Sequence, residues 1–210
     1  MTFISTQKQT WHAIRESWLG AETVNGPGST LHCTTSLRTE LPALLARHHI
    51  TSVLDAPCGD RNWSQHIDFT DYTGWDIDDV QIAADKQRWP QHTFTVCNLL
   101  TVRKIPAVDL IICRDFLIHL PNDRITAVLN KFIASDATYL LASNHPDEHN
   151  TTDLPAEGQD GYAAYWQRPT NLQAEPFTLT HKIDAITEPH HPVAANTEMA
   201  LFDLRAQRAH

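Results

Sequence analysis

The sequence predicts an α/β fold in which a mostly parallel sheet carries helices on both faces. Short apolar segments alternate with segments of helical period from about residue 50 onward. Four of the apolar segments also end in polar or charged residues, as expected where parallel strands present side chains at one edge of a sheet. We expect one domain over residues 1–210, with residues 1–49 as an N-terminal helical cover and residues 50–210 as the Rossmann-like core.

The composition narrows the class of protein. The chain has 210 residues, of which 41% are hydrophobic and 20% charged, as is usual for one globular domain. A formal charge of −9 and the lack of a Lys/Arg cluster argue against nucleic-acid binding. No apolar run is long enough to span a membrane, and no secretory signal begins the chain. We therefore expect a cytoplasmic protein with a small-molecule partner, and the sequence leaves its oligomeric state open.

The N-terminal region is predicted to form two helices joined by a loop. Apolar residues recur along one side of residues 6–19, which predicts a helix, and a glycine-rich loop follows at residues 20–30. Leucines at helical spacing between residues 37 and 45 predict the second helix, which Pro42 should start or kink. The four cysteines form no Cys-x-x-Cys pair, so we expect reduced thiols and no structural zinc.

Strands and helices alternate after this region. The predicted strands are residues 52–56, 71–77, 92–99, 108–115 and 137–143, and the predicted helices are residues 60–67, 78–89 and 121–135. The polar stretch 144–176 is expected to be a long loop, and loops of that length are usually functional or disordered. Residues 177–186 and 198–206 are expected to close the sheet as antiparallel partners.

The carboxyl ends of the predicted strands suggest an adenosine site. Asp76 lies 21 residues after Asp55, and an acid at the end of the second strand can accept hydrogen bonds from both ribose hydroxyls. Asn98 ends the third strand and can pair with an adenine edge, and Trp75, Ile77 and Leu99 could sandwich the base. Any one of these acids is often only a solvated residue or a helix cap, but their ordered occurrence favours a cofactor site.

The first turn distinguishes between adenosine cofactors. A dinucleotide site needs glycines around its pyrophosphate, but this turn has Pro57, Cys58 and Asp60 beside the single glycine Gly59. The carboxylate of Asp60 would repel a pyrophosphate. Together with Asp55 it would instead favour the sulfonium and ammonium groups of S-adenosylmethionine, which carries no phosphate. The sequence therefore predicts S-adenosylmethionine rather than NAD.

The first motif carries a resemblance to a known family. Residues 54–63, "LDAPCGDRNW", resemble the first motif of a bacterial branch of class I S-adenosylmethionine-dependent methyltransferases, and "GPGST" (26–30), "CRDFLIHL" (113–120) and "RPTNL" (168–172) are similar to further parts of that branch. The resemblance implies a seven-stranded sheet whose last strand is antiparallel, and a transferase activity of class EC 2.1.1.-. The residues expected to bind the cofactor are Asp55, Pro57, Cys58, Gly59, Trp63, Asp76, Ile77, Asn98, Leu99 and Arg114.

Residues after the fourth strand are candidates for catalysis. His119 follows Asp115 by four residues, so a helical turn would place both on one face, with His119 as general base and Asp115 orienting it. The alternative interpretation is that His119 is a core histidine with no catalytic role. Arg114 could touch the cofactor carboxylate or pair with Asp115. We expect no metal, although the segment 145–149 has residues that could ligate one.

The acceptor is predicted less specifically than the cofactor. Loops over the strand ends supply the residues expected to bind the substrate, which are Ser29, Thr30, His145, Tyr165, Trp166 and Arg168. The aromatic residues among them could also simply pin the long loop to the domain. We favour O-methylation of a sugar or glycan intermediate. N-methylation of a small amine and a non-catalytic nucleotide-binding regulatory module are the alternatives.

Overall fold

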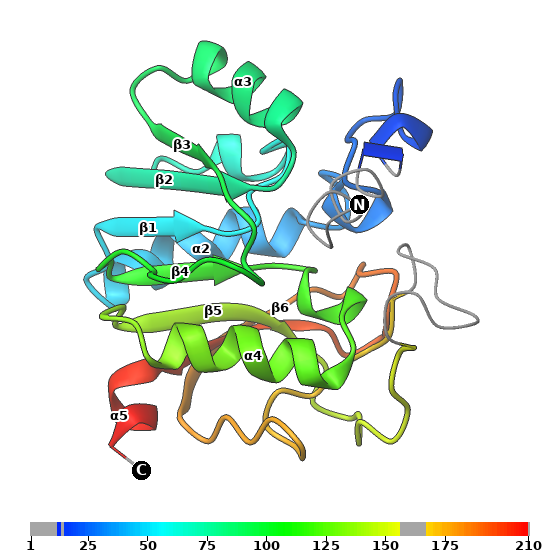
Figure 1. Ribbon diagram of the computed structural model, residues 1–210, viewed down its shortest axis with the longest axis vertical. Helices are drawn as coiled ribbons and strands as arrows, with labels where there is room; N and C mark the ends of the chain where they lie inside the picture. The colour runs from blue at the N-terminus through cyan, green and yellow to red at the C-terminus, as the bar shows by residue number, and fades with distance from the viewer. Residues whose placement is uncertain (1–11, 14, 156–166, 210) are drawn as a thin grey trace.

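A seven-stranded sheet forms the centre of the computed structural model, which describes residues 12, 13, 15–155 and 167–209 (Figure 1). The strand order is β3-β2-β1-β4-β5-β7-β6, and β7 runs antiparallel to both of its neighbours. The strands are β1 (Ser52–Asp55), β2 (Asp71–Asp76), β3 (Thr93–Val96), β4 (Leu110–Cys113), β5 (Tyr139–Asn144), β6 (Lys182–Thr187) and β7 (Glu198–Asp203). The expected seven-stranded, mostly parallel sheet is confirmed.

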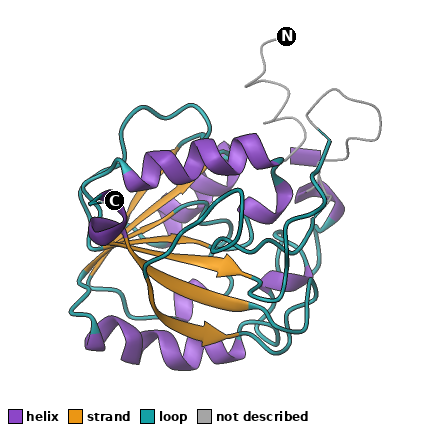
Figure 2. Ribbon diagram, turned by 90° about the horizontal axis from the view of Figure 1, so that it is seen from below, coloured by secondary structure: helices purple, strands orange, loops and turns teal. Residues whose placement is uncertain are grey.

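Helices cover both faces of the sheet (Figure 2). The α-helices are α2 (Thr35–Arg47), α3 (Asp79–Arg88), α4 (Asn122–Ile133) and α5 (Leu204–Arg208), and short 3-10 helices span Pro27–Ser29, Ser64–His66 and Leu117–His119. Strand β4 explains why both faces need a cover, because its four residues are all buried. Leu110 and Ile112 join the core under α2 and α3, whereas Ile111 and Cys113 join the core under α4.

Capping residues fix where two of the helices begin. The side chain of Asp78 accepts hydrogen bonds from the backbone N–H groups of Val80 and Gln81 at the start of α3. Asp203 does the same for Arg205 and Ala206, so the segment predicted as a strand over 198–206 becomes helical at residue 204. None of the described helices is long and apolar enough to cross a membrane.

Other boundaries also differ from the sequence expectations. Helix α2 continues through Pro42 rather than starting there. The short helix expected over 60–67 is only the 3-10 turn Ser64–His66, and the penultimate strand begins at Lys182 rather than at residue 177. Most of the helix predicted over 6–19 lies outside the described residues, although residues 12, 13 and 15–17 are helical.

Candidate active site

A cavity of about 770 Å³ lies at the carboxyl ends of the parallel strands. Strands β1, β2 and β4 run toward the side of the molecule where the N-terminal segment lies, and residues of that segment cover the cavity (Figure 1). Its volume suits an adenosine-sized cofactor with a small second ligand. All ten residues that the sequence predicts to bind the cofactor line it, namely Asp55, Pro57, Cys58, Gly59, Trp63, Asp76, Ile77, Asn98, Leu99 and Arg114.

The carboxylate of Asp76 joins the first-motif loop to the end of β2. Its Oδ2 accepts a hydrogen bond from the backbone N–H of Gly59 at 2.9 Å, and its Oδ1 accepts one from Asp78 at 2.9 Å. Burial raises the pKa of Asp76, and these two backbone donors oppose the rise. Each carboxylate oxygen can accept more than one hydrogen bond, so both retain capacity for the two hydroxyls of a ribose.

The turn at Gly59 depends on a side chain from the N-terminal loop. Gly59 has a φ of +53°, and a Cβ built there would lie 2.0 Å from Nδ2 of Asn25. That amide donates to Oδ1 of Asp60 at 2.8 Å, while Oδ2 of Asp60 accepts from the backbone N–H of Val24 at 2.9 Å. Asp60 is absent from the described cavity lining. Asp60 therefore anchors the N-terminal loop and does not line the cavity, so its predicted effect on the cofactor's cations would not be a direct contact.

Asp55 forms part of the cavity wall at the end of β1. Its carboxylate is almost fully buried and accepts a hydrogen bond from the hydroxyl of Tyr72 at 2.8 Å. Burial raises the pKa of Asp55 to about 7, although the hydrogen bond from Tyr72 and the positive charge of Arg61 both act against the rise. A nearby cation would favour the ionised carboxylate.

A lysine supports the part of the cavity wall that follows β3. The side-chain oxygen of Asn98 accepts from the backbone N–H of Leu100 at 2.8 Å. Nζ of Lys131, on α4, donates to the carbonyl oxygens of Leu99 at 2.9 Å and Leu100 at 2.6 Å. These contacts fix the turn after β3, with the side chains of Trp75 and Leu99 among those that line the cavity beside it.

Asp115 stands at the other end of the cavity in a left-handed backbone conformation, with a φ of +53°. Its carboxylate contacts the guanidinium of Arg114 and the Nε2 of His191, each at 2.9 Å, and accepts from the hydroxyl of Ser143 at 2.8 Å. Burial alone would raise the pKa of Asp115, but Arg114 and then His191 outweigh it and hold the pKa well below its usual range. An acid this strong is a poor general base.

Arg114 belongs to a buried charge network. Its Nε and one terminal nitrogen donate to the carboxylate of Glu188, which has no exposed surface, and the same terminal nitrogen donates to the carbonyl of Gly28 at 2.9 Å. Burial raises the pKa of Glu188, and the charge of Arg114 opposes the rise. Of the two alternatives for Arg114, the structure shows the pair with Asp115. Arg114 also binds the carbonyl of Gly28, which lines the cavity.

Sequence reasoning missed two members of this network. Asp115 was expected to orient His119, but the histidine on its carboxylate is His191, from the loop between β6 and β7. His119 lies in the 3-10 helix Leu117–His119 and lines the cavity. Glu188 and His191 follow no catalytic spacing in the sequence, so no local signal marks them.

The predicted substrate residues are only partly brought to the cavity. Ser29 lines it, whereas Thr30 is outside the described lining and donates its hydroxyl to the carbonyl of Pro27 at 2.9 Å. His145 is buried against Thr170, and Arg168 is buried with its guanidinium on Asn122 and Thr170. Both hold the segment after β5 in place and are likewise outside the described lining. Tyr165 and Trp166 lie outside the described residues.

The residues that could ligate a metal gather elsewhere. Within the described ranges, one group of three has its ligand atoms close together: His12, Asp78 and Asp79. The guanidinium nitrogen Nε of Arg15 lies 3.3 Å from Asp78, so this group already has a cation beside it. The segment 145–149 contributes no residue to that group.

Solved structures of methyltransferases share this fold. A 1,6-didemethyltoxoflavin-N1-methyltransferase from Burkholderia thailandensis, with its acceptor and S-adenosylhomocysteine bound, has a TM-score of 0.61 and 17% identity over 95% of this chain and 86% of its own. An rRNA methylase from Escherichia coli has a TM-score of 0.59 and 14% identity over 93% and 75% of the two chains. The N-methyltransferase NodS from Bradyrhizobium japonicum has a TM-score of 0.54 and 14% identity over 81% of this chain and 96% of its own.

These similarities establish the fold, which is the Rossmann-like α/β fold of those methyltransferases. No protein-family model and no curated protein matches the sequence.

Proposed function

We propose that this protein is an S-adenosylmethionine-dependent methyltransferase that acts on a small polar acceptor. The observation that carries the proposal is the position of the Asp76 carboxylate, which faces the cavity and is held by the backbone N–H groups of Gly59 and Asp78. A ribose fits this carboxylate, an adenine fits between Trp75 and Leu99, and the cationic end fits toward Asp55. No glycine-rich cradle for a pyrophosphate accompanies them in the described first turn, Ala56–Asp60.

The other end of the cavity supports transfer to an acceptor. Bound S-adenosylmethionine supplies a methyl group on a sulfonium, and transfer to a hydroxyl leaves S-adenosylhomocysteine and one proton. We propose that His119 is the general base that takes this proton. Asp115 also lines the cavity, but its lowered pKa makes it too weak a base. Phe116 and Leu120 line the same end and limit water there.

We favour a hydroxyl of a sugar or glycan intermediate as the methylated group. The second candidate is N-methylation of a small amine, which needs no base once the amine is neutral. Two of the structures that share the fold carry N-methyltransferase activity in their names, and this supports keeping that candidate. A non-catalytic module that only binds the nucleotide is the remaining alternative.

Calorimetric titration with S-adenosylmethionine and with NAD tests the cofactor assignment. We expect saturable binding of S-adenosylmethionine and none of NAD, and the reverse result would overturn the assignment. Release of S-adenosylhomocysteine in the presence of sugar and amine acceptors then tests for transfer. Binding without turnover on any acceptor would favour the module, and loss of turnover on adding a chelator would reveal a metal requirement.

A further inference from the structure

Asp115 provides the accessible charge at the acceptor end of the cavity. Its side chain is 16% exposed, whereas that of Arg114 is 3% exposed. The guanidinium of Arg114 is engaged by Glu188, Gly28 and Asp115, so its positive charge is directed into the protein. The other arginine in the described lining, Arg15, pairs with Asp78 at the ribose end. A ligand at the acceptor end therefore meets a carboxylate rather than a cation.

The carboxylate of Asp115 has room for one more donor. An ionised carboxylate offers about four acceptor positions. Three are used, by Ser143 on Oδ1 and by Arg114 and His191 on Oδ2. These partners keep the group ionised and fix its rotamer. Asp115 lines the cavity together with Phe116 and His191.

The backbone at Asp115 supports a ligand-binding role. A non-glycine residue in the left-handed region is strained and persists where its surroundings enforce it, often at ligand sites. Here the hydroxyl of Ser143 accepts from the backbone N–H of Asp115 at 2.9 Å and donates to Oδ1 of the same residue. Gly28 packs so closely that a Cβ there would lie 3.0 Å from Oδ2 of Asp115. The hydrogen bonds of Ser143 and the close contact with Gly28 hold this residue at the wall of the cavity.

We propose that the acceptor carries a cationic amino group and that Asp115 binds this group, as in an amino sugar that is methylated on a neighbouring hydroxyl. This inference rests on the proposed function and names its substrate class. The bound ammonium keeps its proton and is not the nucleophile, so it orients the acceptor while a hydroxyl faces His119. An anionic acceptor, such as a uronic acid or a sugar phosphate, would be repelled by the same carboxylate.

Three sugars that differ in charge test the proposal. Protein saturated with S-adenosylhomocysteine is titrated with glucosamine, N-acetylglucosamine and glucuronic acid below about pH 7, where the amine is protonated. Because a hydrogen bond to a charged group is strong, glucosamine should bind at least about ten-fold more tightly than N-acetylglucosamine, and glucuronic acid should bind more weakly than both. Equal binding of the three, preference for glucuronic acid, or binding of none overturns the proposal.

The variant Asp115→Asn tests whether this residue is responsible. The preference for glucosamine should fall to within about two-fold of N-acetylglucosamine, and a preference kept intact would overturn the assignment to Asp115. The dissociation constant of S-adenosylhomocysteine, measured first on both proteins, reports on the proposed function separately from the acceptor class. A thermal unfolding curve shows whether the variant folds, and if it does not, the comparison of the three sugars on the wild type still decides.

Discussion

The backbone N–H of Gly59 donates to Oδ2 of Asp76 at 2.9 Å, and this bond ties the turn after β1 to the end of β2. Cys58 reinforces the link by donating its backbone N–H to the carbonyl of Trp75 at 2.9 Å. The two strand ends therefore present one continuous surface to a ligand, and the proposed ribose site depends on both.

Asp76→Asn should weaken binding of S-adenosylmethionine by about ten-fold or more, because an amide offers one acceptor oxygen where a carboxylate offers two. Calorimetric titration measures the change. Asp71→Asn is the matched control, since Asp71 is exposed at the opposite end of the same strand and should keep wild-type affinity. Equal affinity of both variants would remove Asp76 from the site.

Gly59→Ala should lower both stability and cofactor affinity. The new Cβ meets Nδ2 of Asn25 and disturbs its bond to Asp60, in addition to about 1–2 kcal/mol for the left-handed backbone. Gly20→Ala is the control, because Gly20 also has a positive φ but no neighbouring atom within 4 Å of the added Cβ. Chemical denaturation should show the larger loss for Gly59→Ala, and an equal loss would mean that the contact with Asn25 is unimportant.

His119→Ala should reduce the rate of methyl transfer by about 10²-fold or more while leaving affinity for S-adenosylmethionine within two-fold, because general base catalysis typically contributes this much. Turnover is followed by release of S-adenosylhomocysteine. The control is His66→Ala, since His66 is exposed and outside the described cavity lining. Full turnover by His119→Ala would contradict the proposed base.

The apo protein should lose stability as the pH rises from about 4 to about 7. The folded protein holds a proton on Asp55, whose pKa is raised to about 7, whereas the unfolded chain releases it near the ordinary pKa of 3.8. The native state therefore binds more protons in this window, and the free energy of unfolding falls by up to about 1.4 kcal/mol per pH unit.

Asp55→Asn should remove that part of the slope, as measured by denaturation at several pH values. The carboxyl of Asp85, whose pKa is raised to about 6, acts in the same direction and is present in both proteins, so the difference between them isolates Asp55. An unchanged slope in Asp55→Asn would show that Asp55 is ionised throughout.

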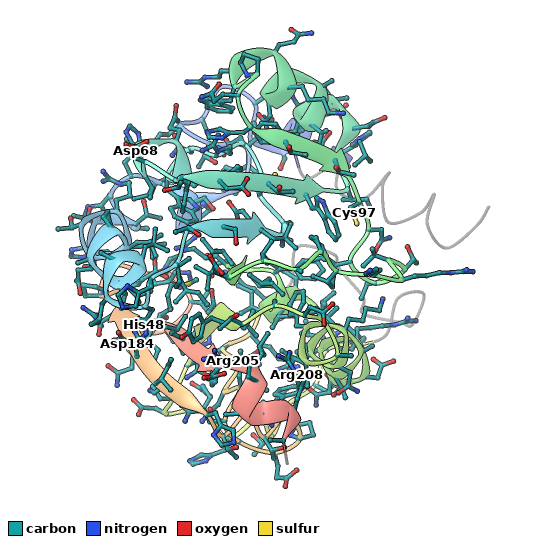
Figure 3. The ribbon with its side chains drawn as sticks, turned by 90° about the vertical axis from the view of Figure 1, so that its left-hand side faces the viewer. His48, Asp68, Cys97, Asp184, Arg205 and Arg208 are labelled. Carbon is teal, nitrogen blue, oxygen red and sulfur yellow. The ribbon has the colours of Figure 1, made fainter. Side chains whose placement is uncertain are left out.

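Glu188→Ala should destabilise the protein by up to about 3–5 kcal/mol, because the buried guanidinium of Arg114 loses one of its two carboxylate partners and keeps only Asp115. The control is the pair of Arg47 and Asp184 at the opposite end of the sheet. Figure 3 shows His48 and Asp184 close together there. Arg47→Ala removes an exposed contact and should cost about 0–1 kcal/mol. Similar losses in the two variants would contradict the structural role of the buried pair.

The amino-acid sequence by itself determined which strand ends bring polar side chains to the proposed cofactor end of the cavity. Each of Asp55, Asp76 and Asn98 directly follows a short apolar segment. Because parallel strands place their carboxyl ends at one edge, local pattern was enough to predict that these residues meet. The same logic predicted α4, whose apolar residues face one core.

Only the tertiary structure decided the contacts at the other end of the cavity, where we propose that the acceptor binds. Arg114 and Glu188 are 74 residues apart in the sequence. Gly28, whose carbonyl accepts a hydrogen bond from Arg114, precedes both of them. Asp115 pairs with His191, 76 residues away in the loop after β6, and this contact replaces the expected pairing with the nearer His119. Asp60 looked available to a ligand but is taken up by Val24 and Asn25. Periodicity and turn chemistry describe neighbours along the chain, whereas these contacts depend on how loops pack across the sheet edge.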